Sequence, residues 1–249
     1  MEIRGLDFAY PDGRGPGRDV LRGITLAVPA GTTLGIVGPV GSGKSTLVGL
    51  LAAVRPVPGG TVFLDGRDLN DLPTGPLRAQ VGIVPQETFL FSRTIAENIA
   101  LGTPGAPRER IEAVARLAQI TRDLPDFPQG LDTLVGERGV TLSGGQRQRV
   151  ALARALLIDP RILILDDALS SVDADTEEAI LAGLRDATRD RTTFVISLRV
   201  SAVLGADRIA VLEDGRIAEE GAPGDLLARD GPFARLRQRQ QIERELEDL

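Results

Sequence analysis

One short segment constrains this chain more than any other. Residues 38–45, GPVGSGKS, fit the pattern G-x-x-x-x-G-K-S/T without a mismatch, between a strand-like segment at 33–37 and a helix-like segment at 44–54. Such glycines let successive backbone N–H groups turn inward around phosphate oxygens, and the helix that follows points its positive end at them. The segment therefore predicts a strand, a turn and a helix in succession around the phosphates of a nucleotide.

The side chains of this phosphate loop have separate expected roles. Lys44 is expected to reach the β- and γ-phosphates, and the Ser45 hydroxyl is expected to ligate Mg²⁺. Lys44 is the only lysine among 29 basic residues, so the one lysine lies where a phosphate needs it. The residues expected to contact the nucleotide here are Gly38, Gly41, Ser42, Gly43, Lys44, Ser45 and Thr46.

Strand-like and helix-like segments alternate along most of the chain. Strands are predicted at 3–10, 21–28, 33–37, 61–64, 81–84, 162–165, 193–196 and 208–212, and helices at 44–54, 94–101, 108–120, 144–157 and 176–188. This alternation favours the α/β class, with a mostly parallel sheet covered by helices. We predict a core over residues 1–86 and 160–249 with a small antiparallel β subdomain near its start, a Gly/Pro-rich loop at 13–17, and an inserted helical subdomain over 87–159. Residues 233–249 are predicted to form a solvated, charged surface helix.

Composition excludes several classes of function. The 249 residues include no cysteine and no histidine, which excludes disulfides, thiolate metal sites, and histidine as a base or a metal ligand. The net charge of −6 and the lack of a basic stripe with interleaved aromatics argue against nucleic acid as the main partner. No apolar run approaches the roughly 20 residues of a membrane helix, so we expect any membrane function to come from a segment or chain outside this sequence.

A second predicted site lies at the end of an apolar segment. Residues 162–165, ILIL, are followed directly by Asp166 and Asp167. Four apolar residues in a row indicate a central buried strand, and ligands of open α/β sheets bind at the carboxyl ends of such strands. We therefore expect Asp166 to lie beside the phosphate loop and to hold Mg²⁺, directly or through water.

The motif LSGGQ at 142–146 opens the predicted helix at 144–157. Glycines that follow a serine at a helix start form another anion-binding end. Because this motif lies downstream of the phosphate loop and about twenty residues before Asp166, the sequence resembles the ATP-binding cassette (ABC) family over nearly the whole chain. The resemblance implies a P-loop NTPase core of the RecA-like type. It also implies that ATP is contacted by Ser143, Gly144, Gly145 and Gln146.

The resemblance implies roles for further single residues. Tyr10 matches the aromatic residue that stacks on adenine, with a core tyrosine as the alternative, and Gln86 matches the glutamine that links the Mg²⁺ site to the helical subdomain. Residues 170–173 resemble the D-loop, which crosses a dimer interface, and its Asp173 is expected near the nucleotide. The implied Mg²⁺ ligands are Ser45, Gln86 and Asp166. Two such domains clamp two ATP molecules head to tail, so each site combines one chain's phosphate loop with the other chain's LSGGQ.

Two further segments resemble those typical of exporters. Residues 133–139, TLVGERG, resemble the segment that touches the coupling helices of the transmembrane domain, and residues 94–99, TIAENI, resemble a second exporter-type stretch. The resemblance implies ATP-powered transport, with attachment to the cytoplasmic face of the plasma membrane through a transmembrane domain. In exporters this domain usually follows a membrane domain in the same polypeptide, so we expect Met1 to lie within a longer chain.

The sequence departs from the family at two catalytic positions. Asp167 replaces the glutamate that acts as general base, and its carboxylate stands back by about one C–C bond length. Leu198, in Ser197-Leu198-Arg199, replaces the histidine that contacts the γ-phosphate and cannot form a hydrogen bond through its side chain. The implied catalytic set is therefore Asp167, Leu198 and Gln86, with Asp167 slow and Leu198 non-functional.

Both losses fall on the chain's own nucleotide site, whereas its LSGGQ motif is intact. Heterodimeric ABC exporters resemble this arrangement, in which one chain carries a degenerate site and the other supplies a working glutamate and histidine. We therefore expect the degenerate-site chain of such a pair, weak or inactive as an ATPase by itself. The alternatives are a homodimeric exporter ATPase in which Asp167 suffices, and a non-hydrolytic ATP-dependent clamp. An importer is disfavoured by residues 135–139.

Overall fold

The structure is a computed structural model that describes residues 1–11, 19–136, 140–187 and 190–247. The chain divides into two compact units. Unit 1 comprises Met1–Arg78 and Asp190–Leu249, and unit 2 comprises Ala79–Arg189. The loop predicted at 13–17 and residues 137–139 of the exporter-like segment lie outside the described residues.

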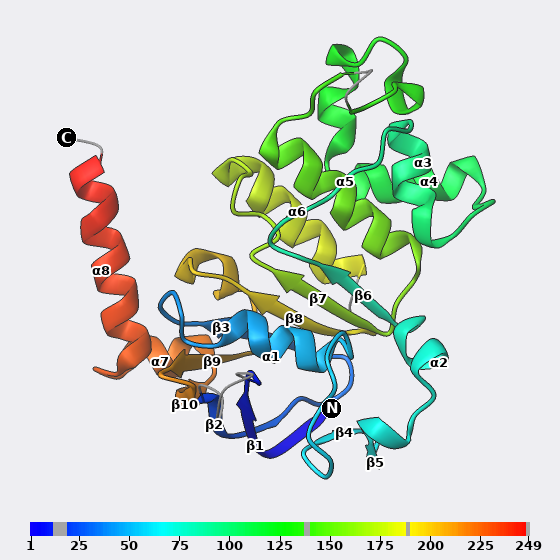
Figure 1. Ribbon diagram of the computed structural model, residues 1–249. Helices are drawn as coiled ribbons and strands as arrows, with labels where there is room; N and C mark the ends of the chain where they lie inside the picture. Colours follow the sequence, from blue (N-terminus) through cyan, green and yellow to red (C-terminus); the bar gives the residue numbers. More distant parts are fainter. Residues whose placement is uncertain (12–18, 137–139, 188–189, 248–249) are drawn as a thin grey trace. The chain divides into compact units, whose positions relative to one another are not determined.

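Unit 1 contains strands of two sheets together with several helices (Figure 1). Its strands are β1 (Glu2–Ala9), β2 (Asp19–Ala27), β3 (Thr33–Val37), β4 (Val62–Leu64), β5 (Arg67–Asp68), β8 (Thr192–Ile196), β9 (Arg208–Glu213) and β10 (Arg216–Gly221). Its helices, with η for a 3₁₀ helix, are α1 (Lys44–Leu51), η1 (Leu69–Asp71), α2 (Thr74–Arg78), η5 (Val200–Val203), α7 (Pro223–Ala228) and α8 (Pro232–Glu247).

The central strand of the parallel sheet in unit 1 leads into the phosphate loop. β3 pairs in parallel with β8 on one side and β9 on the other, with Ile36 opposite Ile196 and Ala210. All of β3 after its first residue is buried, as expected of a strand covered on both faces. β10 pairs antiparallel with β9 and adds a strand that the sequence analysis did not predict.

The second sheet of unit 1 is antiparallel, with strand order β2-β1-β4-β5. The antiparallel part predicted near the start of the chain is therefore confirmed. β1 does not keep the strict alternation predicted for residues 3–10, because its register with β2 shifts along the strand. Gly5 in β1 and Gly23 in β2 have left-handed φ angles of 54° and 60°, which glycine adopts without strain at such irregularities.

Unit 2 contains a parallel strand pair packed against helices (Figure 1). Its elements are β6 (Val81–Val84), α3 (Ile95–Ile99), η2 (Ala100–Gly102), α4 (Arg108–Leu117), η3 (Ile120–Asp126), η4 (Gly130–Asp132), α5 (Gly144–Leu157), β7 (Ile162–Asp166) and α6 (Ala174–Ala187). Helix α5 packs against β6, α3 and α4. A Cβ on Gly82 of β6 would lie 2.7 Å from Pro160 Cγ, so this glycine allows the turn after α5 to approach the strand closely.

The C-terminal helix α8 is packed at its start, which corrects the prediction of a solvated surface helix. Phe233 is fully buried and Leu236 is 7% exposed, whereas Ile242 and Leu246 further along are exposed. The Phe233 N–H also donates to Glu219 Oε2 of β10 at 2.9 Å. The prediction missed this contact because most residues of α8 are Arg, Glu or Gln, and only the apolar side chains of its first two turns indicate a buried face.

The predicted α/β class is confirmed, with parallel strands, a small antiparallel sheet and a helical region. The predicted helix at 94–101 is shorter than expected, because α3 ends at Ile99 and the chain continues as the 3₁₀ helix η2. Among the described residues, no helix combines the length and the apolar character needed to cross a membrane.

Candidate functional site

The phosphate loop follows β3 and opens helix α1, as predicted. Gly43 caps α1 with a φ of 105° and no side-chain hydrogen bond. Lys44 is 9% exposed, and its ammonium donates to the carbonyl oxygens of Gly38 and Pro39 at 2.8 Å each and to Ser42 Oγ at 3.3 Å. The only lysine of the chain is therefore held inside the loop that is predicted to bind phosphates.

Two glycines of this loop leave no room for a side chain. A Cβ on Gly38 would collide with the carbonyl oxygen of Leu212 in β9, and one on Gly43 would lie 2.8 Å from Leu21 Cδ2 of β2. Gly41 has a φ of 82° with open space around it, so it serves only the turn. These close approaches fix the loop against the two sheets of unit 1.

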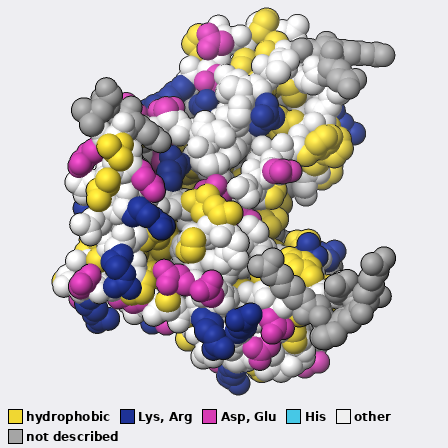
Figure 2. All heavy atoms as spheres, turned by 60° about the vertical axis from the view of Figure 1, so that its left-hand side comes forward, with side chains coloured by type: hydrophobic (Ala, Val, Ile, Leu, Met, Phe, Trp, Pro, Cys, Tyr) yellow, Lys and Arg dark blue, Asp and Glu magenta, His cyan; other side chains and the backbone are white. Residues whose placement is uncertain are grey.

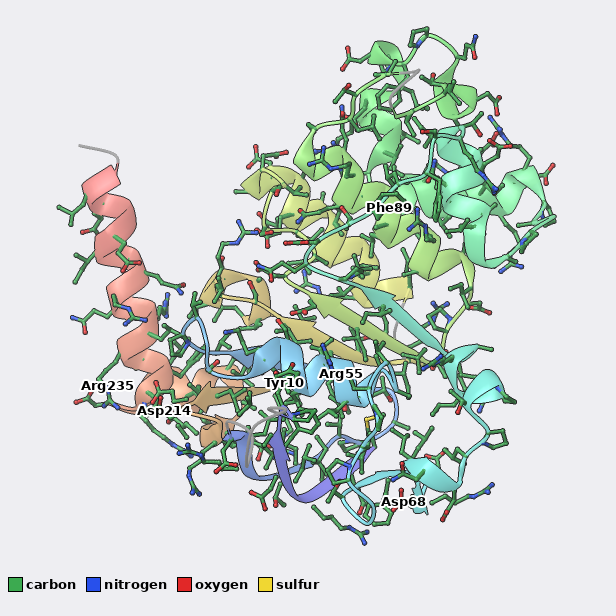
Figure 3. The ribbon with its side chains drawn as sticks, in the orientation of Figure 1. Tyr10, Arg55, Asp68, Phe89, Asp214 and Arg235 are labelled. Carbon is green, nitrogen blue, oxygen red and sulfur yellow. The ribbon has the colours of Figure 1, made fainter. Side chains whose placement is uncertain are left out.

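Tyr10 lies near helix α1, beside Arg55 (Figure 3). Its hydroxyl shares a hydrogen bond of 3.0 Å with Thr46 Oγ1, and its ring meets Phe8 edge-on with centroids 5.3 Å apart. The guanidinium of Arg55 lies over the ring, 5.0 Å from its centroid, at a distance that allows a cation–π contact. Tyr10 is 36% exposed, so it is not a core tyrosine, and its hydroxyl ties it to the start of α1.

Leu198 lies in the loop that follows β8, and we call residues 197–200 the switch loop. The Ser197 N–H donates to the carbonyl oxygen of Ile36 in β3 at 3.1 Å, which joins this loop to the strand that leads into the phosphate loop. Leu198 is half-buried. Its carbonyl oxygen accepts a hydrogen bond of 2.6 Å from Gln240 Nε2 in α8, and the Val200 N–H donates to Gln240 Oε1 at 2.9 Å. The sequence analysis missed Gln240, which belongs to no motif.

In unit 2 the paired carboxylates follow the buried strand β7. Asp166 is its last residue and is 8% exposed, and Asp167 has a left-handed φ of 48°. The Ser170 N–H donates to the Asp167 carbonyl oxygen at 3.2 Å, so a turn leads directly into the D-loop residues. The described residues contain no cluster of three or more Asp, Glu, His or Cys that could hold a metal ion. A Mg²⁺ ion at Asp166 would therefore need hydroxyl, amide, water or phosphate oxygens to complete its ligands.

The LSGGQ motif forms a self-capped helix start. Ser143 precedes α5, its Oγ accepts the Gln146 N–H at 3.2 Å, and Gln146 Oε1 accepts the Ser143 N–H at 2.9 Å. This is a capping box, in which two backbone donors are satisfied reciprocally. Gly145 lies against the D-loop, because a Cβ there would lie 2.7 Å from the Ser171 carbonyl oxygen.

A buried glutamine joins the LSGGQ helix to the D-loop. Gln148 is 4% exposed, its Nε2 donates to Ser170 Oγ at 3.0 Å, and its Oε1 accepts the Ser171 N–H at 2.9 Å. The D-loop ends at Asp173, whose carboxylate accepts the Thr176 N–H at 2.9 Å at the start of α6. This backbone hydrogen bond lowers the pKa of Asp173 below its usual value. The sequence analysis did not identify Gln148.

The segment after β6 presents an aromatic pair to solvent, close in sequence to the exposed Gln86. Phe89 and Phe91 are 68% and 42% exposed, and their rings meet edge to face with centroids 5.0 Å apart. The side chain of the fully buried Asn98 accepts the Phe91 N–H at 2.8 Å and donates to the Phe91 carbonyl oxygen at 3.0 Å. Arg154 donates to the Phe89 carbonyl oxygen at 3.1 Å, and burial lowers its pKa. Polar side chains thus hold an exposed apolar pair in place.

The two exporter-like segments meet in unit 2. Thr94 forms an antiparallel bridge with Leu134, and the Val135 N–H donates to the Arg93 carbonyl oxygen at 3.0 Å. Leu134 is 42% exposed. We call Phe89, Phe91 and Leu134 the apolar surface residues of unit 2. The sequence analysis named the segments 94–99 and 133–139 separately, and the structure joins their described parts.

The predicted site residues are divided between the two units. Unit 1 contains Tyr10, the phosphate-loop residues 38–46 and Leu198, and these are connected through Thr46 and through strand β3. The residues in unit 2 are Gln86, Ser143, Gly144, Gly145, Gln146, Asp166, Asp167 and Asp173. On the face drawn in Figure 2, basic and acidic side chains are interspersed.

Comparisons with known proteins agree with the motifs. Residues 21–170 match the family model for ABC transporters. The chain is 45% identical over 240 residues to the ATP-dependent lipid A-core flippase of Chromohalobacter salexigens, and 46% identical over 243 residues to that of Escherichia coli strain K12. Each match covers 96% of this chain and 41% of the relative.

A solved structure agrees with these relatives. The chain is similar to a bacterial Atm1-family ABC exporter with ATP bound, with a TM-score of 0.90 and 43% identity over 96% of this chain and 41% of that one. The chain therefore spans about 41% of the length of the proteins that it matches. The resemblance to exporter-type nucleotide-binding domains is confirmed, and the chain belongs to the ABC transporter family.

Proposed function

We propose that this chain binds Mg-ATP and powers the export of a substrate by an ABC transporter. The observation that carries the proposal is the phosphate loop, where Lys44 is held among loop carbonyls and Gly38 and Gly43 have no room for side chains. Such a cradle fits phosphates, since the ammonium can exchange carbonyl oxygens for phosphate oxygens. Ser45, Gln86 and Asp166 would hold Mg²⁺, and Tyr10 would stack on adenine.

The proposal includes a head-to-tail dimer of two such domains. Ser143 Oγ accepts a hydrogen bond from Gln146, which leaves the hydroxyl proton available for a phosphate oxygen of a partner's ATP. Asp173 and its D-loop would lie at the same interface, and Gln148 holds the D-loop to the LSGGQ helix. The preserved motif therefore supports a role in completing a nucleotide site on another chain.

The apolar surface residues of unit 2 support docking of a transmembrane domain. Exposed apolar residues commonly mark interaction sites, and Phe89, Phe91 and Leu134 are all exposed. Asn98 and Arg154 hold the backbone of the two phenylalanines in place, and Leu134 is bridged to Thr94. Relatives named as a flippase and an exporter, each much longer than this chain, favour coupling helices as the partner. The domain would then work at the cytoplasmic face of the plasma membrane. We retain residues 87–159 as the proposed helical subdomain and 1–86 with 160–249 as the proposed core.

We propose further that the chain's own nucleotide site is degenerate. Asp167 carries a carboxylate one methylene shorter than glutamate, and Leu198 offers no polar side-chain atom. General-base help is worth roughly 10² to 10⁴ in rate and depends on hydrogen-bond reach. A partner chain with an intact glutamate and histidine would then supply the fast site, which this chain's Ser143 would complete.

ATP affinity and turnover of the 249-residue chain test the proposal, with and without the combined changes Asp167→Glu and Leu198→His. We expect ATP binding with negligible turnover in the unmodified chain, and turnover raised by about 10²-fold or more in the double variant. Lys44→Met in each background is the control, and it is expected to weaken ATP binding strongly and to remove the turnover of the double variant. If the unmodified chain failed to bind ATP, the proposed function would be wrong.

A homodimeric exporter ATPase is the second candidate, and Asp167 favours it because it keeps a carboxylate at the position of the base. In that case the unmodified chain would turn over ATP by itself, and the rate would rise with the square of chain concentration below the dimerisation constant. Asp167→Asn would abolish this turnover. Brisk turnover that Asp167→Asn removes would therefore favour the homodimer over the degenerate site.

A further inference from the structure

The C-terminal helix is joined to the switch loop by one side chain. The amide of Gln240 donates to the Leu198 carbonyl oxygen at 2.6 Å and accepts the Val200 N–H at 2.9 Å. Both hydrogen bonds are partly buried. A single side chain thus engages the backbone on both sides of Arg199, in the way that a neighbouring strand would.

Helix α8 is anchored so that Gln240 is aimed at this loop. Phe233, Leu236 and Gln240 are spaced i, i+3, i+7, which places all three on one helix face. Phe233 is fully buried, and its N–H donates to Glu219 Oε2 of β10 at 2.9 Å. The buried face of α8 therefore fixes the base of the helix on unit 1 and delivers the Gln240 amide two turns later.

A further hydrogen bond of the switch loop reaches β3, the strand that leads into the phosphate loop. The Ser197 N–H donates to Ile36 of β3 at 3.1 Å, two residues before Gly38, and the Arg199 N–H donates to Ser197 Oγ at 3.0 Å. Position 198 is therefore held from β3 on one side and from α8 on the other. Its backbone position depends on both supports.

We propose that Gln240 is a positioning residue that sets where the side chain at 198 stands relative to the phosphate loop. This rests on the proposed function, in which position 198 faces the γ-phosphate of ATP. Helix α8 is then part of the nucleotide site, although no motif lies in it. Leu198 presents no polar side-chain atom at this position. A histidine placed there would contact the γ-phosphate only while Gln240 holds the backbone.

The first test is amide hydrogen exchange of the 249-residue chain with Gln240→Leu. We expect exchange in residues 197–200 to speed up by about tenfold, the effect of losing two typical hydrogen bonds. Gln241→Leu is the matched control, because Gln241 is the adjacent residue and its Nε2 donates only to Glu245 in the described contacts, at 3.1 Å on the surface. If both variants left exchange of the switch loop unchanged, Gln240 would not position it.

The second test measures the ratio of ATP to ADP affinity below the dimerisation constant, because the two nucleotides differ only in the γ-phosphate. We expect Leu198→His to raise this ratio by about tenfold, and Gln240→Leu in that background to remove most of the gain. Gln241→Leu should keep it. Faster exchange with the gain retained would reduce Gln240 to a purely structural role and overturn the proposal. If Leu198→His brought no gain, the assignment of position 198 would fail, and the exchange result would still show whether Gln240 holds the loop.

Discussion

The two glycine-rich helix starts of this protein are built differently. Helix α1, in unit 1, begins after Gly43 with no side-chain cap, and its nearby charge is the ammonium of Lys44. Helix α5, in unit 2, begins after Ser143, whose side chain forms a capping box with Gln146. The start of α1 has no side chain of its own that accepts from its first N–H groups. The start of α5 satisfies two backbone N–H donors through the side chains of Ser143 and Gln146.

This difference bears on the role proposed for each motif. The phosphate loop is a cradle whose central charge is held by weak carbonyl acceptors, so phosphate oxygens can replace them. The start of the LSGGQ helix is already held by contacts within unit 2, since Gly145 lies against Ser171 and Ser143 caps the helix. It can offer a phosphate the Ser143 proton without any rearrangement of the helix. Under the proposed function, the first motif would bind the nucleotide and the second would complete a nucleotide site on a partner chain.

Among the changes that test this comparison, Lys44→Met should have the largest effect, and it should lower ATP affinity. The ammonium is the only group of the phosphate loop that carries a full positive charge, and charge-assisted hydrogen bonds are worth about 1.5–3 kcal/mol each. Loss of two such bonds predicts that ATP affinity falls by about 100-fold or more, measured by calorimetry on the isolated chain. Ser143→Ala is the control, and it should leave that affinity unchanged. Equal losses of ATP affinity in the two variants would contradict the proposal that the phosphate loop binds ATP and that LSGGQ only completes a partner's site.

Gly145→Ala is expected to destabilise unit 2 by about 1–3 kcal/mol, the usual cost of overpacking. The added Cβ would lie 2.7 Å from the Ser171 carbonyl oxygen, and a backbone atom cannot move aside easily. At Gly144 the nearest atom, Ser171 Cβ, lies at 3.1 Å, and the better helix propensity of alanine offsets part of that crowding. Urea unfolding should therefore rank Gly145→Ala well below Gly144→Ala in stability. The reverse order would show that the D-loop does not press on the helix start.

Gln148→Leu should cost about 1–2 kcal/mol of unfolding free energy, since it removes two hydrogen bonds and leaves the Ser171 N–H without this acceptor. Gln148→Glu is the comparison variant, because a carboxylate still accepts from Ser171 but cannot donate to Ser170. Because a carboxylate at this buried position also loses its hydration, thermal or urea unfolding at pH 7 should place Gln148→Glu below the unmodified chain. Identical stability of all three would mean that the D-loop and the LSGGQ helix are held together by packing alone.

The local elements of the site could be predicted from the sequence because each carries its own pattern. β3 and α5 begin and end at the predicted residues, 33–37 and 144–157, since an apolar run between glycine-rich turns marks the strand and a serine-glycine start marks the helix. The antiparallel sheet was predicted from alternation near the start of the chain, although its bulges were not. Patterns of residues close together in the sequence were therefore enough to predict both motifs and most of the strands.

The supports of the site could not be predicted, because they depend on contacts far apart in the chain. Gln148 and Gln240 each stand between polar residues in the sequence, and nothing beside them distinguishes them from a solvated glutamine such as Gln241. The packed start of α8 was missed for the same reason, since Phe233 stands among charged residues. Side chains that hold backbone across 23 or 42 residues of sequence carry no periodic signal.

The smallest expected effect is a difference in how the stability contributions of two helix caps in unit 2, at the starts of α6 and α5, depend on pH. The Thr176 N–H holds the pKa of Asp173 below its usual value, so this carboxylate stabilises α6 above its unfolded-state pKa. The contribution is lost as the pH falls through the lower, folded-state pKa. Asp173→Asn should therefore lower stability at pH 7 and lose most of that difference in strong acid, measured by urea unfolding across pH. Ser143→Ala removes a neutral cap, so its cost of about 1 kcal/mol should stay constant over the same range. A constant difference for Asp173→Asn as well would show that the charge on this cap adds nothing to the hydrogen bond.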